Sequence, residues 1–260
     1  MDPSLNEWLN TVFRWIHVIA GVMWIGHLYF FNFVNSQVAK TFDADSKRKV
    51  VPELMPRALY WFRWGAAYTW VSGILLLGIV YYMGGNLLQA EPSMSVALGT
   101  AVGLVALLLG FVVYDVLWKT GLKKNPLVGT VVSVILLAGV AWWLSCFFSG
   151  RAVFIHIGAL LGTSMAANVW MRIWPAQRKI IAAAKAGQAP DPALAALAGL
   201  RSKHNTYMSV PLIFLMVSNH YPTIYGGRGG WVYAIAFVVV GFLMTWYLYR
   251  KSATDAPARY

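Results

Sequence analysis

The chain has 260 residues, of which 59% are hydrophobic and 12% are charged, whereas soluble domains usually carry about 25% charged residues. This composition excludes an ordinary water-soluble enzyme. The single cysteine, Cys146, excludes a disulfide within the chain, covalent haem attachment through C-x-x-C-H, a cysteine-based zinc site and an iron–sulfur cluster held by this chain alone.

Long apolar stretches recur along the chain, and several exceed the roughly 20 residues that a helix needs to cross a bilayer. The sequence therefore predicts an all-α, polytopic membrane helix bundle that forms one domain, residues 1–260, with about seven transmembrane helices. The expected spans are 8–35, 58–83, 95–118, 126–149, 152–174, 205–222 and 231–250. The Ala- and Pro-rich stretch 175–204 is expected to form a cytoplasmic loop with a short surface helix.

The net charge of +12 would suggest nucleic-acid binding in a soluble protein. Here 18 of the 21 basic residues fall on one side of the expected spans, and the exceptions are Arg14, Arg151 and Arg228. The positive-inside rule then places the amino end in the periplasm and the carboxyl end in the cytoplasm. The charge is thus a topology signal, and we expect a lipid bilayer rather than nucleic acid as the surrounding partner.

Ionisable side chains within a bilayer are costly and are often functional. In the predicted topology His17, His156 and His220 lie toward the outer side, and His27 and His204 lie toward the cytoplasm. A separation of ten residues puts His17 and His27 about 15 Å apart along a helix, so they cannot bind one metal together. Each would need a histidine from another helix, which is how a haem is held between helices.

The outer pair, His17 and His156, is the predicted ligand set for the iron of one b-type haem. Arg14 and Arg151 lie outward of these histidines and suit the two haem propionates, because charge-assisted contacts to carboxylates are strong. Two further residues, Gly21 and Trp24, follow His17 on the same helix face; a glycine there would let a flat macrocycle approach the backbone.

The alternative is that each histidine only forms a hydrogen bond to a neighbouring helix. For the inner pair, His27 and His204, this alternative is favoured over a second haem. We interpret His220 as a polar span end, although it could replace His156. Asp115 is expected to pair with a neighbouring Arg or Lys, with a proton relay as the less favoured role.

Gly158 and Gly162 form a G-x-x-x-G pattern that is typical of helix packing in membranes.

The segment RWIHVIAGVMWIGH at 14–27, followed by YFFNFVN at 29–35, resembles the first span of the bacterial membrane-bound urate oxidase (urate hydroxylase) family. The likeness extends over most of the chain and includes the sequence PRA at 56–58 before the second span. A shorter pattern, His17 followed by Gly21 and Trp24, also resembles the membrane protoporphyrinogen oxidases, which bind b-type haem.

The resemblance implies oxidation of urate to 5-hydroxyisourate in a bacterial inner membrane. Family members typically carry about eight membrane helices and then a periplasmic c-type cytochrome, whereas this sequence has no C-x-x-C-H. The cytochrome is therefore a separate chain, or this member has lost the original activity. An anionic purine needs cationic and aromatic partners, and the candidate pocket for it consists of Arg63, Trp61, Trp64 and Tyr68.

The sequence thus favours a haem-b oxidoreductase that passes electrons from a small reduced substrate to a c-type cytochrome. The main alternative is a non-catalytic membrane subunit, haem-bearing or purely structural, of a larger respiratory assembly. A transporter comes third, since inverted repeats and broken helix pairs are not evident. Whether copies of the chain form a homo-oligomer is left open.

Overall fold

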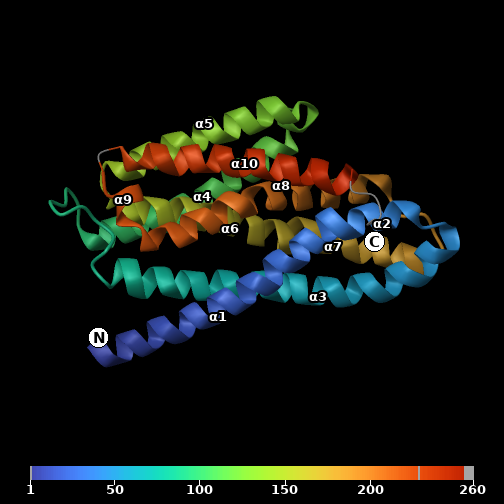
Figure 1. The fold of residues 1–260 in the computed structure, drawn as a ribbon, viewed down its shortest axis with the longest axis horizontal. Helices are drawn as coiled ribbons and strands as arrows, with labels where there is room; N and C mark the ends of the chain where they lie inside the picture. The colour runs from blue at the N-terminus through green and yellow to red at the C-terminus, as the bar shows by residue number, and fades with distance from the viewer. Residues whose placement is uncertain (1, 228, 255–260) are drawn as a thin grey trace.

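The fold was examined in a computed structural model, which describes residues 2–227 and 229–254. Within these ranges the regular structure is helical, apart from an isolated bridge between Leu88 and Phe148. The long helices lie roughly along the long axis of the molecule (Figure 1). Arg228, one of the cations expected on the outer side, lies outside the described residues.

Six helical stretches of the described chain are long and apolar enough to cross a membrane. Three of them contain a π-helical segment with wider turns. These are α1 (Pro3–Tyr29) with η1 (Phe30–Asn35) and α2 (Ser36–Thr41), α3 (Ala44–Leu76) with η2 (Leu77–Tyr82), and α6 (Gly150–Asn168) with η4 (Val169–Ile173) and α7 (Trp174–Lys185). The other three are α4 (Val96–Lys119), α5 (Pro126–Ser145) and α10 (Gly230–Thr254).

The expected span 205–222 falls in the second half of α8 (Pro192–Val217), followed by the short helices η5 (Ser218–His220) and α9 (Pro222–Tyr225). α8 is not among the six apolar stretches, because its first half carries Arg201, Lys203 and His204. The stretch 175–204, expected to be a loop, is mostly helical: α7 runs to Lys185 and α8 begins at Pro192. Only a short connection separates the two helices.

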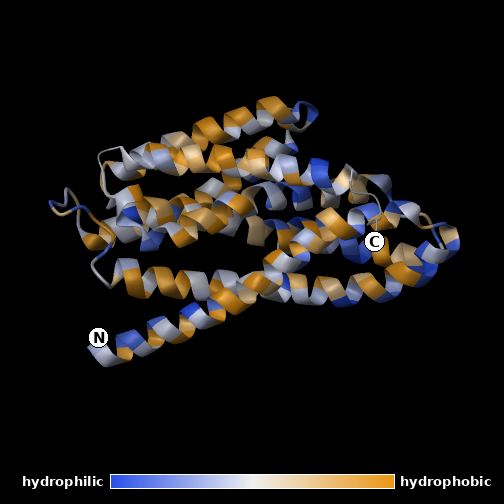
Figure 2. Ribbon diagram, in the orientation of Figure 1, coloured by the Kyte–Doolittle hydropathy of each residue, from blue (hydrophilic) through white to orange (hydrophobic). Residues whose placement is uncertain are grey.

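α6 forms the centre of the bundle. In its most apolar window 78% of the residues are buried, whereas the corresponding value is 17–33% in the other five apolar stretches. Those other helices expose large apolar side chains, among them Leu127 and Leu243, and hydrophobic residues run along the length of α5 and α10 (Figure 2). Such surfaces fit a helix bundle whose outer faces contact lipid.

Glycines let the helices approach each other closely. A Cβ atom at Gly65 of α3 would lie 3.1 Å from the backbone nitrogen of Trp24, so α1 and α3 touch backbone to backbone at this point. A Cβ atom at Gly158 of α6 would lie 3.1 Å from the Cε atom of Met216 on α8. The predicted packing role of the G-x-x-x-G pattern is therefore confirmed at Gly158.

A buried ionic cluster joins α4, η4 and α8. The side chain of Asp115 is 7% exposed and pairs with Arg172 at 2.6 Å, Lys119 at 2.7 Å and Arg201 at 2.9 Å. The Arg201 side chain is 1% exposed, and its guanidinium also lies over the ring of Tyr114. The expected pairing of Asp115 with neighbouring cations is thus confirmed, and one carboxylate contacts three cations.

We predict that Asp115→Asn lowers the free energy of unfolding by about 3–5 kcal/mol, because it leaves the buried Arg201 without its carboxylate. The matched control is Glu53→Gln, which removes the exposed i,i+4 pair with Arg57 and should change the free energy of unfolding far less, because water screens an exposed pair. Unfolding of both variants in the same detergent provides the measurement. Equal losses in the two variants would show that the cluster is not a structural centre.

Candidate functional site

His156 lies on the second turn of α6. The helix begins after Ser149, whose hydroxyl accepts a hydrogen bond from the backbone N–H of Ala152. The His156 side chain is 1% exposed, and its Nδ1–H donates to the carbonyl oxygen of Ala152 at 2.7 Å. In the neutral ring Nε2 is then the acceptor, and it receives the hydroxyl of Tyr82 at 3.0 Å.

His17 shows the same arrangement on α1. Its Nδ1 lies 3.2 Å from the Oγ atom of Ser72, and that hydroxyl donates its own proton to the carbonyl oxygen of Tyr68 at 2.6 Å. Because the Ser72 proton is already used, the Ser72 oxygen accepts from His17 Nδ1–H. The lone pair of His17 is therefore on Nε2.

The two histidines contact different parts of the stretch formed by α3 and η2. Gly73 of α3 faces His17, since a Cβ atom there would be 3.0 Å from its Cε1 atom. His156 contacts Tyr81 and Tyr82 of η2, with ring centroids 6.4 and 5.8 Å apart. The α3–η2 stretch thus carries side chains that meet both histidines.

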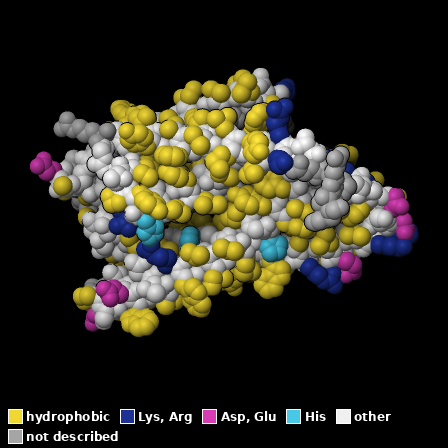
Figure 3. Space-filling model, viewed as in Figure 1, with side chains coloured by type: hydrophobic (Ala, Val, Ile, Leu, Met, Phe, Trp, Pro, Cys, Tyr) yellow, Lys and Arg dark blue, Asp and Glu magenta, His cyan; other side chains and the backbone are white. Residues whose placement is uncertain are grey.

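Cationic and polar side chains surround this pair toward the outer end. Arg151 donates to the Oδ1 atom of Asn219 at 3.1 Å, and Tyr81 donates to the same oxygen at 2.6 Å. Arg14 is exposed and is held by Asn10 of its own helix at 3.0 Å. Both arginines lie within electrostatic range of the Tyr81 hydroxyl. Histidine and Lys or Arg side chains gather around a hollow on this face of the molecule (Figure 3).

Gly21 and Trp24 face α3. The nearest side chain to a Cβ atom on Gly21 would be that of Thr69, at 3.8 Å, and Trp24 is 2% exposed within the core. These two residues thus serve the contact between α1 and α3. Gly103 of α4 packs directly against His156, since a Cβ atom there would lie 2.7 Å from His156 Nε2.

The inner histidines are held differently from each other. The Nδ1–H group of His27 donates to the carbonyl oxygen of Met23 at 2.7 Å. His204 lies against α4: its ring centroid is 4.1 Å from that of Trp118, and its Nδ1 is 2.9 Å from the Tyr114 hydroxyl. The hydrogen bonds and ring contacts of His27 and His204 within the described residues involve no shared partner.

His204 also has the opposite tautomer. The hydroxyl oxygen of Tyr114 accepts from the Nδ2 atom of Asn168 at 2.9 Å. Among the hydrogen bonds of the described residues, the acceptor for the Tyr114 proton is the Nδ1 atom of His204. The His204 proton then resides on Nε2, which is unlike the arrangement at His17 and His156. His220, at the end of η5, is exposed, which fits a polar span end.

The predicted purine pocket is an aromatic cluster in the structure. The Arg63 guanidinium lies 4.0 Å from the ring centroid of Trp174, and Trp64 contacts both Tyr68 and Trp170. The Trp61 and Tyr68 side chains are about half exposed on the outer surface of α3. The Nε atom of Arg63 is buried without a partner. The aromatic rings over which Arg63 lies are thus those of Tyr60 and Trp174, which were not predicted.

Several residues that position the site were not identified from the sequence. Ser72 is a single hydroxyl in the apolar run of α3, and Tyr81 and Tyr82 are typical of tyrosines at a span end. The signal that could have identified Ser72 is its spacing of four from Tyr68, which places its hydroxyl beside a backbone carbonyl. Within the described residues, no three His, Cys, Asp or Glu side chains form a metal site, so the two histidines would need a macrocycle to complete the coordination of iron.

A family model described as urate oxidase N-terminal matches the chain over residues 3–50 and 41–259. No curated protein and no solved structure matches the chain. The family match covers nearly all of the sequence and includes both helices that carry the outer histidines. The chain therefore belongs to the urate oxidase N-terminal family.

Proposed function

We propose that this chain is the membrane part of a urate-oxidising oxidoreductase, with one b-type haem held by His17 and His156. The observation that carries the proposal is the shared tautomer. Each ring donates Nδ1–H to a fixed oxygen, the Ala152 carbonyl or the Ser72 hydroxyl, and keeps its lone pair on Nε2. Histidines that ligate metals commonly have their other ring N–H fixed in this way.

The residues that would hold the group are His17 and His156 at the iron and Arg14 and Arg151 at its rim. A haem with two histidine ligands has no open coordination position and would carry electrons rather than bind oxygen. To act as a ligand, His156 has to exchange the Tyr82 hydroxyl for the iron, and α4, which packs against Nε2 at Gly103, has to move away from the ring. Arg14 and Arg151 are the cations that would hold the propionates near the outer end.

Urate is the proposed reductant because of the family to which the chain belongs. Oxidation of urate with water to 5-hydroxyisourate releases a pair of electrons and protons. The electrons would leave toward a separate c-type cytochrome, because the sequence has no C-x-x-C-H. A respiratory complex is the alternative acceptor. Arg63 with Trp61, Trp64 and Tyr68 is the proposed contact for the substrate anion.

The first prediction concerns haem binding. Purified protein should show a sharp absorption band pair on reduction, and His17→Ala and His156→Ala should each abolish it, because a single imidazole cannot form the low-spin centre. His204→Ala is the control, since its Nε2 carries the proton, and it should retain most of the haem. Full haem retention in His17→Ala would refute the ligand assignment.

Addition of urate to the oxidised protein separates an enzyme from a membrane anchor. Reduction of the haem bands by urate supports the oxidoreductase. If dithionite reduces the haem and urate does not, even with a c-type cytochrome present, the non-catalytic subunit becomes the better description.

The second prediction concerns the outer arginines. A cation beside the haem destabilises the more positive, oxidised iron, so its removal should lower the reduction potential. Arg14→Gln and Arg151→Gln should each lower the potential by about 30–60 mV, which is about 0.7–1.4 kcal/mol for a one-electron couple. Redox titration of the haem bands measures this change, with the remote Arg57→Gln as the control. An unchanged potential in both variants would place the propionates elsewhere.

The third prediction concerns orientation in the bacterial inner membrane. Since 18 of the 21 basic residues fall on one side of the expected spans, a tag at the amino end should report the periplasm and a tag at the carboxyl end the cytoplasm. Accessibility of the two tags in intact cells distinguishes the possibilities. Periplasmic exposure of both tags would require an even number of spans.

A further inference from the structure

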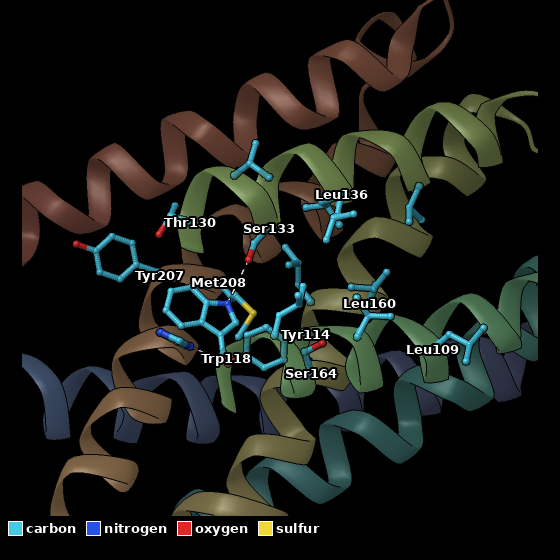
Figure 4. Close-up of a pocket in the computed structure, with 18 of the residues that line it drawn as sticks. Leu109, Tyr114, Trp118, Thr130, Ser133, Leu136, Leu160, Ser164, Tyr207 and Met208 are labelled. Carbon is cyan, nitrogen blue, oxygen red and sulfur yellow. Dashed lines mark hydrogen bonds between the residues drawn. The ribbon is translucent and has the colours of Figure 1, made fainter. Parts of the chain in front are cut away.

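A large apolar cavity lies on the side of the bundle away from α1. Its volume is about 900 Å³, and it is lined by α4, α5, α8 and α10 with α6 at the back. Most of the lining side chains are aliphatic (Figure 4). Residues at its edge, such as Leu109, Leu136 and Trp246, are 44–56% exposed on the outer surface of the bundle. The cavity therefore opens toward the lipid-facing surface.

One wall of the cavity is polar. Trp118, Tyr114 and Ser164 lie next to one another along it (Figure 4), and His204 also lines it. Ser164 is 1% exposed, and its hydroxyl is buried without a hydrogen-bond partner. The Nε2–H group of His204 is a second donor, because Nδ1 accepts from Tyr114; no hydrogen bond from this Nε2 to the described residues is found. Unpaired donors in an apolar environment cost free energy, so this wall is suited to a ligand with acceptors.

We infer that this cavity binds a lipid-soluble quinone. A quinone has a flat ring that fits between aliphatic side chains, ring carbonyls that accept from the Ser164 hydroxyl and His204 Nε2–H, and an apolar tail that can leave through the lipid-facing opening. Ligand cavities of about 300–1,000 Å³ with a few placed polar groups are typical of small-molecule sites. A lipid acyl chain has no acceptor and would leave both donors unpaired.

The two donors, the Ser164 hydroxyl and His204 Nε2–H, are themselves uncharged. Among the described cavity-lining residues only Lys203 carries a formal charge. A neutral ring with two carbonyls suits these two donors. The site is separate from His17 and His156, so quinone binding does not require the haem.

The experiment is equilibrium binding of decylubiquinone to the full chain in nanodiscs, measured by calorimetry. Ser164→Ala removes one donor and should weaken binding about three- to tenfold, because a hydrogen bond of this kind contributes about that much. Thr130→Val is the matched control, since Thr130 lines the same cavity but its hydroxyl already donates to the carbonyl oxygen of Pro126. This variant should bind with unchanged affinity.

Two further measurements make the result decisive. Decylbenzene has the same tail without ring carbonyls and should bind much more weakly than decylubiquinone, and the variant His17→Ala should keep its quinone affinity even if it loses haem. Equal affinity for the two probes, or equal affinity of Ser164→Ala and Thr130→Val for decylubiquinone, would show an apolar groove filled by lipid and would overturn the assignment. Loss of quinone binding in His17→Ala alone would show that the site depends on the haem region.

Discussion

The constraint on which this structure depends is the high cost of an unpaired polar group in hydrocarbon. The chain meets it repeatedly in one way: a side chain bonds to the backbone carbonyl one turn earlier in its own helix. Thr69 donates to Gly65, Ser133 to Gly129 and Thr245 to Gly241. In each pair the glycine is also a point of close helix contact. The close contact between helices and the hydrogen bond of the polar side chain thus occur in the same helical turn.

The histidines extend this pattern from packing to chemistry. His156 and His27 bond to the carbonyl four residues earlier, whereas His17 reaches a serine on the neighbouring helix. A bond to a fixed acceptor determines which ring nitrogen carries the proton, so the fold determines which nitrogen is available to a ligand. At His204 the proton is on the other ring nitrogen, Nε2. Tyr114 accepts from Asn168 and directs its own proton to Nδ1 of His204.

The sequence was informative where one physical signal dominates. The length of the apolar stretches identified the expected spans that correspond to the six long apolar helices. The cost of burying a lone carboxylate indicated that Asp115 would be paired. Hydropathy failed for 175–204 because the polar first half of α8 is stabilised by partners on other helices, which a local average cannot detect. Spacing along the helices did not indicate the direction of each histidine ring: His204 faces α4 because Trp118 and Tyr114 lie there.

The contact between Tyr82 and His156 depends on the number of residues in the π-helical segment η2, which continues α3. A π-turn accommodates about one residue more than an α-turn. A homologue shorter by one residue within Leu77–Tyr82 would close this segment into a regular helix and rotate all that follows by about 100°. Tyr82 would then no longer face His156. Whether a relative of this chain keeps this contact therefore depends on the number of residues between positions 77 and 82 as well as on their identity.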